Sequence, residues 1–382
     1  MKKSHFMLAA ALPVALLFSC AKNTAIPLEK EPLLEGPTGV ISVQLQTPAS
    51  ETKATSLSDN DVKSVQLFVY TSEGTLETSK YFADYNSGTD LKITAKTGSK
   101  TLYVVLNADR LNFSKMSRFD SPSTTGTDDL ADLSKNTADK LIMVGKKNVD
   151  VREYDPNKNA SPVTSDVSVH VKRLTSKILL DKVTVDFRNT ALEGGSLDIQ
   201  QIYLVNVVGK SPYGVADEGD GSAAKGNPVT LPSSHLNTMT NWYSKGTFSD
   251  GAPAVTFDHL SSNLSCNVSG NETAIGRSYL AYPNPADEYQ ASPSVTAPVH
   301  TCLVIKAKAK SGSLIDTPID KNTYYTFDLP KLEANKLYRI TNINITMLGA
   351  DNPGERITTG KVKPTIIVDE WTDGLVNLEY DF

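Results

Sequence analysis

The sequence predicts an all-β fold made of antiparallel β-sandwiches. Wherever the sequence is regular, apolar and polar residues alternate with a period of two, which is typical of strands that bury one face. The segments between these runs are rich in Gly, Ser, Asn, Asp and Pro, as turns and loops are. One segment, residues 128–139, favours a short helix, so few helices are expected.

The first predicted strand covers residues 40–47, where the odd-numbered residues from Ile41 to Leu45 share an apolar face. Residues 101–107 are almost continuously apolar, which predicts a strand covered on both faces. Within an alternating run of valines, His170 has the opposite parity, so it is expected to face solvent. The other predicted strands are 62–71, 165–188, 201–208, 300–306, 324–329, 338–347 and 364–371.

The chain is longer than one ordinary domain, which predicts two domains. Residues 21–39 are rich in Pro, Glu and Lys and are expected to form a flexible tether without a fold. A β-run ends near Asn189, where a break with two glycines follows. We therefore expect an N-terminal sandwich over residues 40–188 and a C-terminal sandwich over residues 189–382.

The N-terminus has the pattern of a bacterial lipoprotein signal. Two lysines follow Met1, residues 6–18 are apolar, and Leu-Phe-Ser-Cys at 17–20 looks like a lipobox. We expect residues 1–20 to form the signal, which ends at the lipobox Cys20. This cysteine would carry the lipid, including palmitate, that anchors the precursor in the outer membrane. An ordinary secretory signal is the alternative, but no A-x-A-like cleavage site lies nearby.

The sequence offers little for catalysis or for nucleic-acid binding. The net charge is −5 and no concentrated run of Lys and Arg is present, which argues against a nucleic-acid partner. The motifs of metalloproteases, serine hydrolases, P-loop proteins and CxxC proteins are missing, and the five histidines are scattered. We therefore expect that the protein is not an enzyme and holds no metal or cofactor.

Two smaller features leave alternatives open. Cys266 and Cys302 remain once Cys20 is lipidated, and in an oxidising compartment they could form a disulfide or stay as two buried thiols. Trp242 and Tyr243 could form a platform on which a sugar stacks, as in a surface glycan-binding lipoprotein. A place in the core or in an exposed loop explains this pair equally well.

The segment after the first strand and the C-terminal segment point to a mechanism. Residues 48–56 are small and polar and contain one basic residue, so a trypsin-like protease is expected to cut between Lys53 and Ala54. At the C-terminus, residues 375–382 alternate in the manner of an amphipathic strand. Such a segment needs a partner strand, either in another subunit or within its own C-terminal domain. Its apolar residues are Val376, Leu378, Tyr380 and Phe382.

Several segments, taken in order, resemble the fimbrillins of Bacteroidetes, the FimA-like and Mfa-like fimbrial subunits of type V pili. They are the lipobox, the first strand with the Lys53–Ala54 site, VHVKRLTSKI at 169–178, LEANKLYRI at 332–340, the run 343–349 and IIVDEW at 366–371. The cleavage residue departs from the family, because an Arg-specific protease would leave Lys53 intact. A protease of Lys-directed or broader specificity is therefore expected.

The resemblance implies two transthyretin-like antiparallel β-sandwich domains and a structural subunit of a cell-surface fimbria that supports adhesion. Ile41, Val43 and Leu45 would lie in a strand that completes the N-terminal sheet and leaves with residues 40–53 after the cut. The C-terminal donor strand of another copy, or of a related fimbrial subunit, would take its place. A fimbrial anchor or tip subunit is the alternative role, and a host or bacterial surface ligand is a further expected partner.

Overall fold

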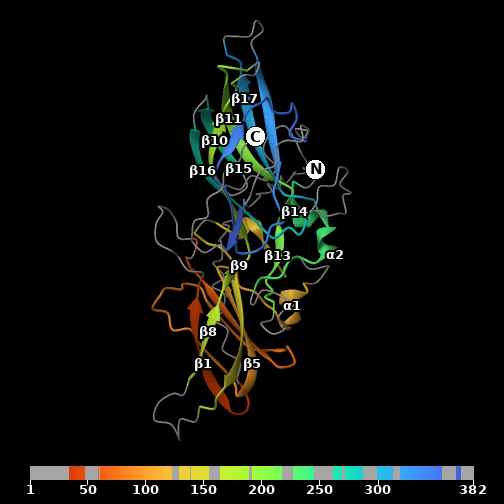
Figure 1. Cartoon of the computed structure of the whole chain (residues 1–382). Helices are drawn as coiled ribbons and strands as arrows, with labels where there is room; N and C mark the ends of the chain where they lie inside the picture. Colours follow the sequence, from red (N-terminus) through yellow and green to blue (C-terminus); the bar gives the residue numbers. More distant parts are fainter. Residues whose placement is uncertain are drawn as a thin grey trace, which may run out of the picture. The chain divides into compact units, whose positions relative to one another are not determined.

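The computed structural model describes residues 34–47, 59, 61–122, 129–137, 139–154, 164–188, 192–216, 227–244, 261–268, 272–286, 299–312, 319–354 and 367–370. All of them fall in one compact unit, Leu34–Phe382. The described residues form β-strands for the most part (Figure 1), with two short helices, α1 (Ser117–Asp120) and α2 (Ser233–Leu236). The predicted all-β class is confirmed. Among the described residues, no helix has the length and apolar character to cross a membrane.

Two sheets form the first sandwich. One has the order β4-β1-β8, and the other has the order β3-β2-β5-β7-β9. The strands are β1 (Thr38–Gln46), β2 (Val65–Thr71), β3 (Leu76–Phe82), β4 (Lys92–Lys96), β5 (Gly98–Leu106), β7 (Met143–Val151), β8 (Thr164–His170) and β9 (Lys172–Arg173). Valines, leucines and isoleucines from both sheets form one buried cluster between them, here called the first core. In Figure 1, β1, β8 and β5 lie together in this part of the molecule.

The five-stranded sheet of this sandwich is covered on both faces along β2 and β5. Leu67 and Val104 point into the first core, whereas their neighbours Phe68 and Tyr103 belong to a second, larger core. Phe119 of α1 covers this second face and stacks on Tyr103 with 4.1 Å between ring centroids. The prediction that residues 101–107 form a strand covered on both sides is therefore confirmed, because one row of alternate residues faces each core.

Two further sheets pack through the second core. Their orders are β16-β10-β19-β21, with β20 also paired to β10, and β15-β11-β17-β18. The strands are β10 (Ser176–Val185), β11 (Ser196–Val205), β15 (Ser261–Val268), β16 (Glu272–Ala281), β17 (Cys302–Lys310), β18 (Asp320–Asp328), β19 (Lys336–Ile340), β20 (Ile343–Ile345) and β21 (Ile367–Glu370). The β1–β8, β10–β19 and β10–β20 pairs are parallel, and the other described strand pairs are antiparallel.

The prediction of a helix over residues 128–139 is wrong. This segment contains β6 (Leu130–Asp132), which pairs with β13 (Lys210–Pro212), and the 3-10 turn η1 (Leu133–Lys135). The Asp132 carboxylate accepts a hydrogen bond from the Ser134 amide at 2.9 Å, so it caps the turn and stops the strand. The remaining short elements are β12 (Val207–Val208), β14 (Trp242–Tyr243) and the 3-10 turn η2 (Met239–Asn241).

Strand pairing bears on the predicted domain boundary near Asn189. Strand β10 precedes that boundary, yet it pairs with β16, β19 and β20, which all follow it. The first core is built from residues 41–171, whereas the second core draws on residues on both sides of the boundary. The two-domain division stays a prediction, and the pairing favours a division before β10, near Leu174, in place of one after it.

Candidate functional site

Strand β1 lies in the interior of its sheet, with a neighbour along each edge. It pairs antiparallel with β4 from Thr38 to Ser42, and parallel with β8 from Val40 to Gln46. A backbone hydrogen bond outside these strand pairs also holds the start of β1: the Thr38 carbonyl accepts from the Tyr154 amide at 2.9 Å. Removing β1 would therefore leave two facing strand edges with unpaired backbone groups.

The apolar face of β1 fills the first core. Ile41 is 0% exposed and Val43 is 6% exposed, while Leu45 is half-buried and packs on the same cluster. Opposite them lie side chains of the second sheet, among them Val65 and Leu102. The alternation predicted from the sequence is present, since Gln44 and Gln46 are exposed on the other face. Loss of the strand would thus open an apolar groove between β4 and β8.

A glycine allows β1 to approach the end of β7 closely. A Cβ atom on Gly39 would stand 1.9 Å from the Arg152 carbonyl oxygen and 2.9 Å from a Val151 methyl carbon. Backbone atoms cannot yield to a side chain as a flexible side chain can, so any other residue type at this position would force the two backbone segments apart. Gly39 was not singled out from the sequence. The signal was a lone glycine beside a strand pattern, which indicates close backbone approach.

The chain on either side of the expected cleavage site is held by the segment 171–177. On the upstream side, the Gln46 carbonyl accepts from the Val171 amide at 3.0 Å. On the downstream side, the Asp59 carboxylate pairs with the Lys177 ammonium at 2.6 Å, and its carbonyl accepts from Nε of the fully buried Arg173 at 3.2 Å. Asp59 is thus anchored by bonds that do not involve β1.

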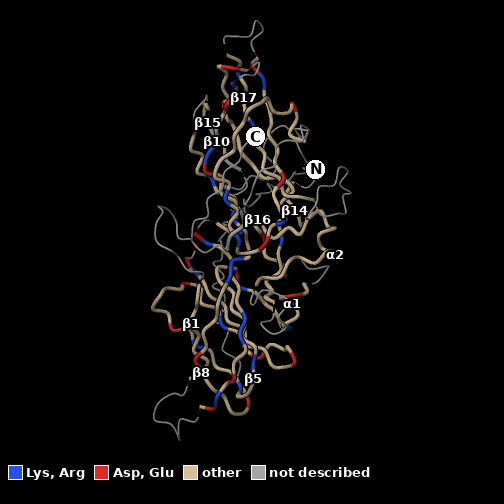
Figure 2. The backbone as a smooth tube through the Cα atoms, viewed as in Figure 1, with Lys and Arg blue, Asp and Glu red and all other residues tan. Residues whose placement is uncertain are grey.

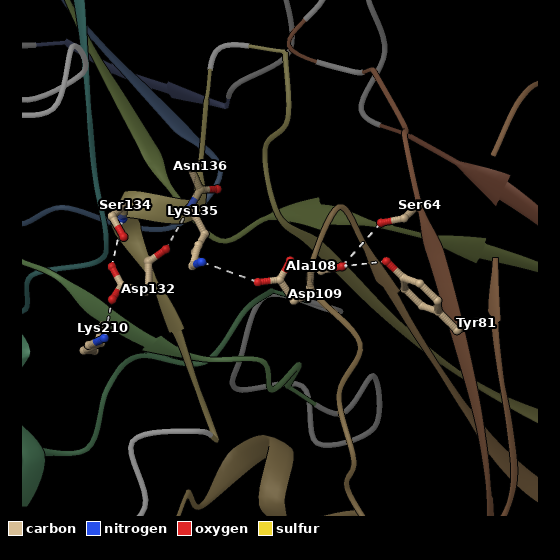
Figure 3. Close-up of polar contacts among 9 residues, drawn as sticks. All are labelled: Ser64, Tyr81, Ala108, Asp109, Asp132, Ser134, Lys135, Asn136 and Lys210. Carbon is tan, nitrogen blue, oxygen red and sulfur yellow. Dashed lines mark hydrogen bonds and ion pairs between the residues drawn. The ribbon is translucent and has the colours of Figure 1, made fainter. Parts of the chain in front are cut away.

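A polar cluster around Asp132 connects β6 to residues of the second half of the chain, and Figure 3 shows Asp132 with Ser134 and Lys210. The Asp132 carboxylate receives bonds from the Lys210 ammonium and from the Tyr243 hydroxyl, the latter at 2.6 Å. Partial burial raises the pKa of this carboxyl, but bonds from Lys210, Tyr243 and Ser134 outweigh burial and hold the pKa at about 2. The carboxylate is therefore ionised at neutral pH and joins β6, β13 and β14.

Hydrogen bonds and one exposed ion pair complete the view in Figure 3. The hydroxyls of Ser64 and Tyr81 both donate to the Ala108 carbonyl oxygen, each at 3.4 Å. Lys135 and Asp109 form an ion pair at 3.6 Å, with side chains 62% and 71% exposed. Solvent screens such a pair, so it contributes little to stability. Figure 2 shows that lysines and arginines are interspersed with aspartates and glutamates along the described chain.

Several predicted sites lie outside the described residues. These are the lipidation site Cys20, the cleavage site Lys53–Ala54 and the donor residues Val376, Leu378, Tyr380 and Phe382. Near the donor segment, β21 pairs antiparallel with β19, so the strand expected over residues 364–371 is internal to the subunit over Ile367–Glu370. His170 is exposed, as its parity predicted.

The disulfide that the sequence left open is not formed, and Cys266 and Cys302 are not bonded to each other. They lie on opposite sides of β11, where Cys266 faces Ile199 and Cys302 faces Val205. That offset places their Cα atoms about 20 Å apart at the usual rise of a strand. A disulfide needs about 7 Å or less. Of the two alternatives, two separate thiols are therefore found, although only Cys302 is buried.

The structure does not support a sugar platform at Trp242. The indole is 5% exposed, belongs to the second core, and donates from Nε1 to the Leu236 carbonyl at 2.9 Å. The Tyr243 hydroxyl is engaged by Asp132. Trp242 is thus a core residue, which was the other interpretation of this pair. Within the described part of the chain, no group of three His, Cys, Asp or Glu side chains is placed to hold a metal ion.

The sequence and the structure were compared with known protein families and solved structures. Residues 40–178 match the family model of the major fimbrial subunit protein, FimA. No curated protein sequence matches the chain. The match begins within β1 and ends within β10, so it includes β1 from Val40 onward, both of its neighbours in the sheet and the whole first core.

Three solved structures share the fold over most of their length. One is a proposed cell adhesion protein of Parabacteroides distasonis ATCC 8503, with 17% identity, a TM-score of 0.57, and coverage of 87% of this chain and 98% of that one. Another is a proposed cell adhesion protein of Bacteroides eggerthii DSM 20697, with 17% identity, a TM-score of 0.55, and coverage of 91% and 99%.

The third structure is a fimbrilin, FimA, of Porphyromonas gingivalis W83, with 17% identity, a TM-score of 0.54, and coverage of 83% of this chain and 93% of that one. At this level of identity the three structures establish a common β-sandwich fold. The resemblance predicted from the sequence is thereby confirmed: this chain is similar to the FimA family of major fimbrial subunits over residues 40–178 and has the fimbrilin fold.

Proposed function

We propose that this protein is a structural subunit of a fimbria that polymerises by exchanging a β-strand. In the precursor, β1 occupies its own groove. A trypsin-like protease cuts at Lys53–Ala54, β1 leaves, and the C-terminal strand of another copy or a related subunit adds to the open edges of β4 and β8. Because the contact runs from the tail of one subunit to the groove of the next, it produces an open filament.

The observation that carries this proposal is the position of β1 between two strands, with Ile41 at 0% exposure. A fully buried aliphatic side chain stabilises by roughly 1.5–3 kcal/mol, and each ladder hydrogen bond adds about 1 kcal/mol net. A covalently tethered β1 competes at high effective concentration, so an incoming strand cannot displace it. Cleavage removes this advantage and acts as the switch.

The anchored Asp59 supports a one-sided release. Its bonds to Lys177 and Arg173 hold the chain downstream of the cut, and they involve no residue of β1. A cut between Thr47 and Asp59 would therefore free the upstream strand while the rest of the subunit stays folded. In the same proposal, Cys20 carries the lipid that holds the precursor at the outer membrane, and the assembled fimbria supports adhesion to a host or bacterial surface ligand.

The test is limited digestion of the purified precursor with trypsin, followed by gel electrophoresis and electron microscopy. The cut chain should form ladders and filaments, and a chain lacking residues 375–382 should be cut but stay monomeric. A matched Lys53→Ala chain should resist the cut and also stay monomeric. Equal polymerisation of the shortened chain would show that the donor assignment is wrong.

An anchor role differs from the stalk role in its N-terminus. An anchor subunit keeps β1 and the lipid on Cys20, whereas a stalk subunit begins at Ala54. Mass spectrometry of surface material separates the two. The glycan-binding alternative loses its platform residue because Trp242 lies in the core.

A further inference from the structure

We propose that a glycine sets the register in which one subunit receives the tail of the next: Gly374 takes the place of Gly39. The inference rests on the strand exchange proposed above and goes further, because it assigns each tail residue to one position of the groove. The tail would run as β1 does, antiparallel to β4 and parallel to β8.

At Gly39, a backbone carbonyl of the neighbouring segment occupies the space that a side chain would need. The Arg152 carbonyl oxygen would be 1.9 Å from a Cβ atom at this position. A bond to β8 that does not depend on β1 holds Arg152 in place, because the Arg152 amide donates to the Ser165 hydroxyl at 3.0 Å. In the precursor, the Tyr154 amide also donates to the Thr38 carbonyl of β1 at 2.9 Å. Any strand that fills the whole groove therefore needs a glycine here.

The tail contains one glycine at a suitable place. Among residues 372–382, Gly374 is the single glycine. When it is aligned with Gly39, the apolar residues of the tail coincide with the apolar face of β1. In that alignment Val376 takes the place of Ile41, Leu378 that of Val43, and Tyr380 that of Leu45.

The exchanged side chains suit the burial of each position. Ile41 is 0% exposed, and the smaller Val376 fits the same space. Leu45 is half-buried, so Tyr380 in its place can bury the ring and keep its hydroxyl in water. Gln44 and Gln46 are exposed, so Glu379 and Asp381 in their places remain hydrated. The replacement thus buries no carboxylate.

Other registers fail on the same criteria. A shift of two residues keeps the apolar face inward but brings Thr372 or Val376 against the Arg152 carbonyl, where a Cβ atom does not fit. A shift of one residue turns Asn377 and Glu379 into the first core, and burying an unpaired carboxylate is costly. The glycine and the alternation together leave one register.

Disulfide cross-linking between subunits tests directly which tail residue lies opposite a given groove residue. Gln44 is the partner of Ser168 on β8, and neighbouring strands are about 5 Å apart, which suits a disulfide. In full-length chains with Cys266→Ser and Cys302→Ser, the pair Ser168→Cys and Glu379→Cys should link subunits after the cut. The matched pairs with Asn377→Cys or Asp381→Cys in place of Glu379→Cys should link at least tenfold less.

A second variant tests the glycine itself. Gly374→Ala should slow polymerisation of the cut chain at least tenfold, whereas Asn377→Ala, which alters the outward face, should leave the rate within twofold. Preferential linking through residue 377 or 381, or normal assembly of Gly374→Ala, would overturn the register while strand exchange stands. If the cut parent chain neither links nor polymerises, the register and the proposed function are both overturned.

Discussion

Truncating Ile41 is the perturbation whose effect on the precursor is best defined by the structure. This side chain is 0% exposed in the first core, on a strand paired along both edges. Ile41→Ala removes three carbon atoms, which costs about 2.4 kcal/mol at about 0.8 kcal/mol per buried carbon. The cavity that remains adds to this, so the free energy of unfolding should fall by about 2–5 kcal/mol.

The assay is urea unfolding of the uncut chain, with Gln44→Ala as the matched control on the same strand. Gln44 is exposed, so its truncation should change the free energy of unfolding by no more than about 0.5 kcal/mol. The midpoint of Ile41→Ala should drop while the urea dependence stays constant. Equal effects of the two substitutions would contradict this prediction, because β1 would then stabilise the chain no more through its inner face than through its outer face.

The other predictions concern the glycine constriction, the polar cluster and the second core. Gly39→Ala in the uncut chain should cost about 1–3 kcal/mol by overpacking against the end of β7, measured by urea unfolding. Asp132 has a depressed pKa of about 2 against an ordinary 3.8, so its carboxylate stabilises fully above about pH 3.8 and loses this contribution as the pH falls to about 2. Asp132→Asn should therefore cost up to about 2 kcal/mol at pH 7 and progressively less below pH 3.8, while Asp109→Asn in the exposed pair should change little at either pH. Trp242→Ala should lower the free energy of unfolding by about 3–5 kcal/mol, because the indole lies in the core.

The β-strands with clear alternation could be predicted from sequence because one face of each is buried. The first strand was expected over 40–47 and is found over Thr38–Gln46, with Ile41 and Val43 buried as expected. The period of two carries this information whatever the neighbouring strands are. It does not say which strands pair, so the position of β1 between β4 and β8 emerges only in the fold.

Local patterns failed where distant partners decide the conformation. Residues 128–139 seemed helical, but β6 pairs with β13, which is far along the chain, and Asp132 caps the turn that follows. Trp242 could not be assigned from its neighbours, because its burial depends on the second core. The role of Asp59 depends likewise on Arg173 and Lys177, more than a hundred residues later.

Mass spectrometry of the subunit within assembled surface fimbriae decides whether β1 is removed before subunits join. We expect that the assembled chain begins at Ala54 and that peptides covering β1 are absent from the polymer. Intact chains that still carry residues 38–46 throughout the polymer would contradict it, since a groove filled by its own strand cannot receive another.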